Sequence, residues 1–275
     1  MLTRFDAYTA TTRAAKAQDL FPILLRADDK FREAKGHHGF AHRASFVGRD
    51  GAEAASVSWG GTHGDLIMLE AKGERTPAIV DRIRSSYEHR CTRVDSCHDV
   101  DAPGAFEALL KPCIQVKKDY KLKGSKAGDW DDFPEDGRTL YVGANTSPVK
   151  LRLYEKGHQP EYRHLNKPDW VRIELQVRPA KDAKDAYSRA DSLAVWGASA
   201  WTREIAGLVL AAQLAPLPAG TTYKLDDRDR ALRFMCKQYG NHLIGLYNDL
   251  GNWDEVGQAL AVIIKKNKMF ADSKK

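Results

Sequence analysis

The chain has 275 residues, 43% of them hydrophobic, and a net charge of +6. That composition supports a sizeable core, and no stretch approaches the roughly 18 apolar residues that a membrane-spanning helix needs. The N-terminus MLTRFDAYTATTRAAK has no apolar signal-peptide core, so we expect a cytoplasmic protein with reduced cysteines. None of Cys91, Cys97 and Cys113 forms a CxxC pair, which argues against a zinc site. An excess of basic over acidic residues is compatible with a polyanionic partner but does not identify one.

The first half of the chain predicts strands and helices in alternation, with no visible internal repeat. A strand is expected at 3–9, followed by a mixed, partly helical stretch at 15–34 and a loop at 36–42. Two segments of alternating apolar and polar residues, 54–61 and 64–73, are joined by a glycine-rich turn and predict a β-hairpin.

Further along the chain, a helix should begin at Thr76-Pro77. The remaining expected elements are a strand at 91–101, a helix at 103–118, a long polar loop at 117–138, strands at 138–144, 149–157 and 169–179, and helices at 226–247 and from Asp254.

These elements define an α+β fold with a central, largely antiparallel β-sheet and helices packed on one face, followed by a helical C-terminal region. We expect two domains, a body at 1–190 and a helical region with a basic tail at 191–275. The apolar stripes of the last helices are interpreted as core rather than as partner sites, and Trp196 and Trp201 should pack inward.

Three of the expected strands each place polar side chains on one face, since residues i, i+2 and i+4 of a strand point the same way. The sets are Asp95, Cys97 and Asp99; Arg152, Tyr154 and Lys156; and Arg172, Glu174, Gln176 and Arg178. A half-exposed antiparallel strand commonly shows this alternation, so the pattern alone favours a solvated sheet face.

The same side chains also fit phosphodiester chemistry. Carboxylate oxygens suit Mg²⁺ or Mn²⁺, and such an ion can polarise a phosphate and orient it for in-line attack. A tyrosine hydroxyl can then attack phosphorus. Its ordinary pKa near 10 means that it needs activation by a metal, a cation or a base.

Three blocks, in this order, resemble the replication initiation factor family, which includes rolling-circle initiators of plasmids and filamentous phages and related relaxases. They are TRVDSCHD at 92–99, TLYVGANTSPVKLRLYEKG at 139–157 and DWVRIELQVR at 169–178. The resemblance implies that Tyr154 is the nucleophile and that Asp95, Asp99 and Glu174 are associated with a divalent metal. It also implies that Arg93, Arg152, Lys156 and Arg172 are the basic positions that contact phosphate or brace the carboxylates.

The family implies an enzyme that nicks and rejoins one strand of origin DNA, single-stranded or hairpinned at the nick site, through a 5′-phosphotyrosine. A lysine-rich segment at 111–128 would hold the backbone, or would be a solvated linker. Host helicase and polymerase and a second copy of the chain are the further expected partners. The alternatives are a mobilisation relaxase, a non-catalytic DNA-binding regulator on the same fold, and a sheet-based binding protein with no nucleic-acid role.

This chain departs from the family pattern at Asn145, where many members have arginine, so phosphate contact from that turn would be weaker. The segment GHHGFAH lacks a His-hydrophobic-His pattern, and His37, His38 and His42 are interpreted as surface or DNA-contact residues. His98 should face away from Asp99 on an ideal strand.

Overall fold

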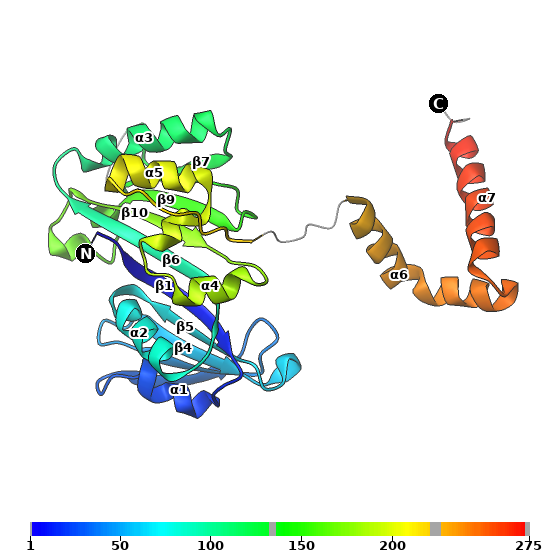
Figure 1. Ribbon diagram of the computed structural model, residues 1–275, viewed down its shortest axis with the longest axis horizontal. Helices are drawn as coiled ribbons and strands as arrows, with labels where there is room; N and C mark the ends of the chain where they lie inside the picture. Colours follow the sequence, from blue (N-terminus) through cyan, green and yellow to red (C-terminus); the bar gives the residue numbers. More distant parts are fainter. Residues whose placement is uncertain (1, 132–135, 221–226, 273–275) are drawn as a thin grey trace. The chain divides into compact units, whose positions relative to one another are not determined.

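The computed structural model describes residues 2–131, 136–220 and 227–272. It divides into two compact units, residues 1–222 and 223–275. The first unit is built on an antiparallel sheet that has ten strands in the described part of the chain, in the order β2-β3-β4-β5-β1-β6-β10-β9-β8-β7 (Figure 1). The predicted α+β class, with an antiparallel sheet and a helical C-terminal region, is confirmed.

The strands are β1 (Arg4–Thr12), β2 (Lys30–Lys35), β3 (His42–Val47), β4 (Glu53–Trp59), β5 (Ile67–Lys72), β6 (Arg90–Asp101), β7 (Gly124–Gly128), β8 (Arg138–Val142), β9 (Val149–Glu155) and β10 (Trp170–Val177). The helices are α1 (Ala17–Leu24), α2 (Thr76–Ser86), α3 (Ala105–Asp119), α4 (Ala183–Arg189), α5 (Ala200–Leu210), α6 (Asp227–Leu250) and α7 (Trp253–Asp272).

The strand order reveals an internal duplication that the sequence does not show. One strand, one helix, a four-strand meander and a second helix occur twice, as β1-α1-β2-β3-β4-β5-α2 and as β6-α3-β7-β8-β9-β10-α4. In each copy the last meander strand pairs with the first strand, and β1 and β6 pair antiparallel at the centre. The expectation of no internal repeat, drawn from the sequence, is therefore wrong for the topology, in which the order of strands and helices repeats.

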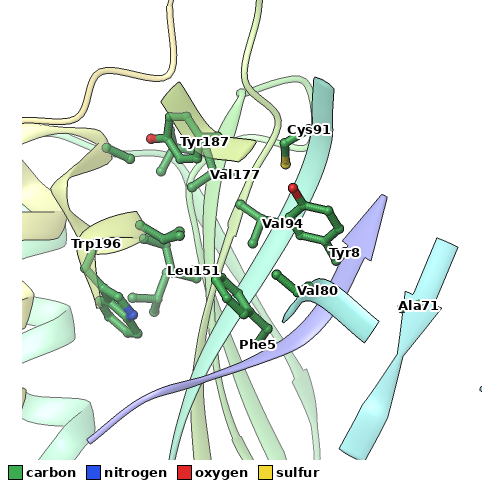
Figure 2. Close-up of a cluster of buried hydrophobic side chains, with 14 of the residues drawn as sticks. Phe5, Tyr8, Ala71, Val80, Cys91, Val94, Leu151, Val177, Tyr187 and Trp196 are labelled. Atoms are coloured by element: carbon green, nitrogen blue, oxygen red, sulfur yellow. The ribbon is translucent and has the colours of Figure 1, made fainter. Parts of the chain in front are cut away.

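The helices cover one face of the sheet, where alternate residues of β9 and β10 form the core with side chains from α3 and α5. Leu151, Leu153, Ile173 and Leu175 are buried there, together with Trp196 and Trp201. Figure 2 shows Leu151 and Trp196 in this core. The inward packing predicted for both tryptophans is confirmed. Because these tryptophans and α5 belong to the core, the first unit continues past the predicted domain boundary at residue 190.

The sequence patterns do not predict three of the strands, for identifiable reasons. β2 and β7 are the two edges of the sheet and are exposed along their whole length, so they carry no apolar alternation. β7 lies inside the predicted loop 117–138, of which 132–135 fall outside the described residues. β3 follows the histidine-rich turn, in a stretch for which the patterns predict no element.

The second unit is a pair of helices, α6 and α7, in which the rings of Tyr247 and Trp253 stack with centroids 4.8 Å apart. Val256 is buried, but Leu232, Phe234 and Ile244 remain exposed within the unit, so its apolar stripes are not the core that the sequence predicts. Asp226 and the last three residues of the basic tail lie outside the described residues. No described helix combines the length and apolar character needed to cross a bilayer.

Leu151 lies fully buried between the sheet and the helices, whereas Leu208 on α5 is 59% exposed. We therefore expect Leu151→Ala to lower the free energy of unfolding by about 2–5 kcal/mol and Leu208→Ala to change it by less than about 0.5 kcal/mol. Urea denaturation followed by circular dichroism measures both. Equal effects of the two substitutions would contradict this description of the core.

Candidate active site

The register of three central strands sets polar side chains in rows across the sheet face opposite the helices. Arg172 pairs with Asp99 on one side and with Tyr154 on the other. One step along, Glu174 pairs with Cys97 and Arg152. These rows place the polar residues of β6, β9 and β10 side by side, as the alternation of each strand predicts.

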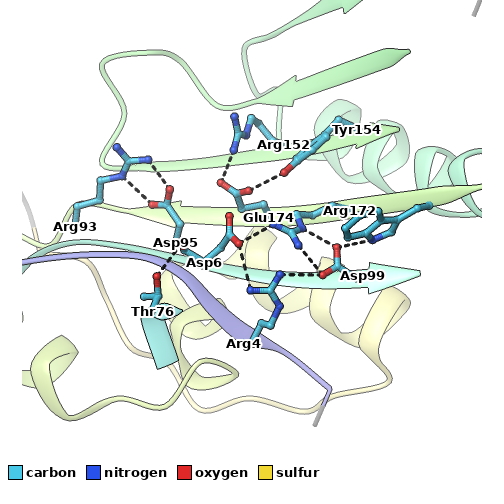
Figure 3. A network of polar contacts seen from close by, with 11 residues as sticks. Arg4, Asp6, Thr76, Arg93, Asp95, Asp99, Arg152, Tyr154, Arg172 and Glu174 are labelled. Atoms are coloured by element: carbon cyan, nitrogen blue, oxygen red, sulfur yellow. Dashed lines mark hydrogen bonds and ion pairs between the residues drawn. The ribbon is translucent and has the colours of Figure 1, made fainter. Parts of the chain in front are cut away.

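Each of the three carboxylates implied by the resemblance is bound to an arginine (Figure 3). Arg93 Nε donates to Asp95 Oδ1 at 2.9 Å, and Arg152 Nη2 donates to Glu174 Oε1 at 2.7 Å. Asp99 receives both Nε and Nη2 of Arg172, at 2.6 and 2.7 Å. Paired, bidentate contacts of this kind allow charged groups to be buried.

Arg172 is the centre of the network, although its side chain is only 1% exposed. Besides Asp99 it binds Asp6 on β1, with Nη1 to Oδ1 at 2.7 Å. Arg4 also contacts both carboxylates, at 3.3 and 3.4 Å. Sequence reasoning missed Arg4 and Asp6. Alternation along β1 places these two residues on one face, but it carries no signal of which distant strands they contact.

Tyr154 lies on this polar face and is only 4% exposed. Its hydroxyl donates to Glu174 Oε2 at 3.2 Å, so one carboxylate holds both Arg152 and the phenol. The guanidinium carbon of Arg152 lies 5.0 Å from the centre of the Tyr154 ring. The structure thus brings together the three residues from adjacent strands that the sequence grouped by face.

Lys156 follows β9 in a 3₁₀ turn and lies among aromatic rings. Its Nζ is 3.9 Å from the ring centre of Tyr162, 5.2 Å from that of Trp170 and 6.0 Å from that of Tyr154. Aromatic faces attract an ammonium group, but removal from water disfavours its charge. Burial, with the nearby Arg172 charge, lowers the pKa of Lys156 to about 8.

Burial shifts the other titratable groups as well. It raises the pKa of the Tyr154 phenol, and the neighbouring Glu174 charge adds to that rise. Burial also raises the pKa of Glu174, against the opposing effect of Arg152. For Asp99, burial acts in the same direction, but the hydrogen bonds and charge of Arg172 outweigh it and lower the pKa. Glu174 is therefore the more basic carboxylate, and it is the one that contacts the phenol.

The carboxylates do not form a single metal-ligand set in this arrangement. Asp95, Asp99 and Glu174 are each occupied by a different arginine, and across residues 2–131, 136–220 and 227–272 no three acidic, histidine or cysteine side chains converge on one point. A hard cation needs several oxygen ligands around it. The donor set therefore does not fit a divalent ion as it stands.

Other sequence candidates lie away from the phenol. His98 Nδ1 contacts the carbonyl oxygen of Leu2 at 2.6 Å, and His37 lies 3.6 Å from Glu70 in the first half of the sheet. The amide of Asn145 accepts a hydrogen bond from Lys150 at 2.6 Å at the exposed β8–β9 turn. This turn thus binds a lysine from the next strand.

Residues 106–204 match the family model of the replication initiation factor. The match confirms the resemblance to this family, and it covers Tyr154, Lys156 and Glu174 but not the β6 residues Asp95 and Asp99. A solved structure of the rolling circle replication initiator protein from Geobacillus stearothermophilus is similar at 21% identity and a TM-score of 0.44, covering 64% of this chain and 74% of that chain. The comparison with curated proteins found no match.

Removing Arg172 should destabilise the protein strongly, because it leaves the half-buried Asp6 and Asp99 carboxylates without their main partner. We expect Arg172→Met to lower the free energy of unfolding by about 3–5 kcal/mol. The matched control is Arg178→Met, at the exposed residue that directly follows β10, with a change within about 0.5 kcal/mol. Denaturant titration at neutral pH makes the comparison, and similar values for the two variants would rule out this role for Arg172.

Proposed function

We propose that this protein is a rolling-circle replication initiator that nicks one strand of origin DNA and later rejoins it, with Tyr154 as the nucleophile. The observation that supports the proposal is the contact between the Tyr154 hydroxyl and the Glu174 carboxylate, flanked by Arg152 and Arg172 on one sheet face. That group combines a nucleophile, a proton acceptor and cations suited to a phosphate.

In the proposed reaction, Tyr154 Oη forms a bond to phosphorus and gives its proton to Glu174. The P–O3′ bond breaks, the 3′ oxygen takes up a proton, and the products are a 5′-phosphotyrosine and a free 3′-hydroxyl. A carboxylate with a raised pKa is a better base for this transfer than an ordinary one. The reverse transesterification rejoins a strand.

The cations have separate roles in this proposal. Arg152, half-exposed beside the phenol, is placed to contact the phosphate and stabilise the charge that develops on its oxygens. Lys156 supplies positive potential or a proton to the leaving oxygen. Arg172 is fully committed to Asp6 and Asp99, so it positions the strands. Since Tyr154 is nearly covered, we infer that DNA binding must expose its hydroxyl.

A divalent ion, Mg²⁺ or Mn²⁺, remains part of the proposal because of the family resemblance. Asp95, Asp99 and Glu174 are its proposed ligands, and an ion there would have to compete with the arginines that now hold them. When bound, it would polarise the phosphate. The other proposed partners are origin DNA held by the lysine-rich segment 111–128, a host helicase and polymerase, and a second copy of the chain.

A second candidate function has one observation in its favour. Tyr154 is buried and the carboxylates are paired with arginines, and a DNA-binding regulator without catalysis would also show both features. A mobilisation relaxase would share the nicking chemistry, and only the DNA that it recognises would differ. A nicking assay on supercoiled DNA that carries the chain's own origin separates the initiator from the regulator, because only the initiator would cut this DNA.

Replacing the proposed nucleophile gives the most direct prediction. Tyr154→Phe should lower nicking of supercoiled origin DNA by at least about 10³-fold and leave DNA binding intact, because only the attacking oxygen is removed. Tyr141→Phe on β8 is the matched control and should nick normally. Mass mapping of the DNA–peptide adduct should identify Tyr154; an adduct on Tyr141 or Tyr162 would disprove the assignment.

The lowered pKa of Lys156 predicts a pH dependence. If its positive charge assists cleavage, single-turnover nicking should decline as the pH rises through about 8, because the ammonium then loses its proton. Lys156→Arg keeps its charge at these pH values and should remove the decline. A decline of the same shape in the arginine variant would assign it to another group.

The metal proposal is tested by chelation. EDTA should stop nicking, and excess Mg²⁺ or Mn²⁺ should restore it, whereas gel-shift binding of origin DNA should persist throughout. Ca²⁺ serves as a control for a purely structural role of the ion. Full single-turnover nicking in EDTA would remove the metal from the proposal and leave the arginines as the cations that stabilise the phosphate.

A further inference from the structure

A cavity of about 1230 Å³ lies at the end of the sheet remote from Tyr154. The end of β1 at 11–14, the α2–β6 connection at 84–90 and helix α4 line it. Arg90 in its wall and Asp99 in the network are nine residues apart on β6. At roughly 3.3 Å per strand residue, the cavity and the candidate active site are about 30 Å apart along that strand.

The cavity is strongly basic. Five of its lining side chains are cationic and two are acidic, and the cationic ones are Arg13, Arg84, Arg90, Lys184 and Arg189. Arg90 is paired with Asp185 at 2.9 Å, and Arg13 is paired with Asp65. Within the described residues, Lys184 and Arg189 have no side-chain hydrogen bond or ion pair, which leaves two cations of α4 in the cavity wall open to a ligand.

Arg84 adds a third donor. Its guanidinium lies 5.3 Å from the centre of the Phe5 ring, and its Nη2 donates to the carbonyl of Ala190 at 2.6 Å. Its Nε is buried and has no hydrogen-bond partner among the described residues. Arg84 lines the cavity and so adds a third positive charge to its wall.

The remaining lining indicates which anion fits. Hydroxyl groups of threonine and serine are frequent in the wall, and among its described residues Tyr87 is the one phenol or indole. Cations and hydroxyls are typical donors to backbone phosphates, whereas proteins that hold single strands stack bases on several aromatic rings. The chemistry therefore favours the sugar-phosphate backbone of duplex DNA.

We propose that this cavity binds backbone phosphates of duplex DNA, as a second DNA-binding region separate from the nicking site. The inference rests on the proposed function, since it assumes that DNA is the partner. Because one base step advances 3.4 Å along a strand, a phosphate held about 30 Å from Tyr154 lies about nine nucleotides from the nick. The cavity would thus hold the flanking duplex while the polar sheet face acts on the scissile phosphate.

The test uses the full chain and DNA that needs no known origin. Lys184→Glu combined with Arg189→Glu reverses the two unpaired charges of α4 and leaves Arg84 in place. The control, Arg26→Glu combined with Lys30→Glu, makes the same charge change at exposed positions outside the cavity. Affinity for a random-sequence duplex of 40 base pairs and for a random 8-nucleotide single strand is measured across salt concentrations.

The cavity variant should bind the duplex roughly 10–100-fold more weakly than the control, with a logarithmic salt slope lower by about 2, one for each phosphate that α4 no longer binds. Its affinity for the short single strand should match that of the control. Equal duplex affinity in the two variants would overturn the proposal. So would weaker binding of ATP or inorganic phosphate with duplex binding retained, since the cavity would then be a small-anion site.

These outcomes are independent of catalysis. If the wild-type chain nicks no DNA, the proposed function fails, but the duplex comparison still supports or rejects DNA binding by the cavity. Tyr154→Phe provides the internal check, because it should leave duplex affinity and its salt slope unchanged. A change in either with Tyr154→Phe would mean that the measured duplex binding involves the nicking face, against the separation proposed for the cavity.

Discussion

Arg172 brings a full positive charge into the interior of the sheet, and the polar face depends on how that charge is compensated. Two carboxylates, Asp6 from β1 and Asp99 from β6, bind its guanidinium. A buried charge without these partners would be strongly unfavourable, so the three strands are fixed in one register by electrostatics as well as by backbone pairing. That register in turn sets Tyr154 beside Arg172 and one row from Glu174. The position of the candidate nucleophile is thus a consequence of a charge network rather than of the core alone.

The sequence predicts much of this arrangement, because period-two alternation identifies which residues of one strand share a face. Alternation groups Arg152 with Tyr154 on one strand and Arg172 with Glu174 on another, and the structure brings Arg152, Tyr154 and Glu174 into contact. It carries no information about partners on distant strands, so Arg4 and Asp6 could not be assigned. It also describes the polar face as solvated, whereas mutual ion pairing has buried Arg172 and Glu174. The sequence does not predict the edge strands β2 and β7 for a related reason, since their exposed residues form no apolar pattern.

The expected three-carboxylate metal site shows a further limit of reasoning by residue type. Acidic residues on one face are compatible with a cation, but arginines on the same face are equally compatible with the acids, and nothing in the spacing ranks the two pairings. In the structure each carboxylate has a guanidinium at hydrogen-bond distance. The pairs at Asp95 and Asp99 are bidentate, the pair at Glu174 is a single short hydrogen bond, and an incoming divalent ion must offset the disruption of all three. A phosphate, by contrast, can contact the half-exposed Arg152 while Arg93 and Arg172 keep their carboxylates.

The internal duplication places the candidate active site and the basic cavity in different parts of the first unit. In the second half, β9 and β10 carry the tyrosine and the glutamate; the corresponding meander strands of the first half, β4 and β5, carry serines and Glu70 but no tyrosine. The phenol chemistry is therefore confined to one copy. The basic cavity lies at the junction of the copies, where β1 ends and α2 connects to β6, with α4 as its further wall. β6 contributes to both features, with Arg90 in the cavity wall and Asp99 in the charge network, so this strand links the proposed duplex site to the candidate active site.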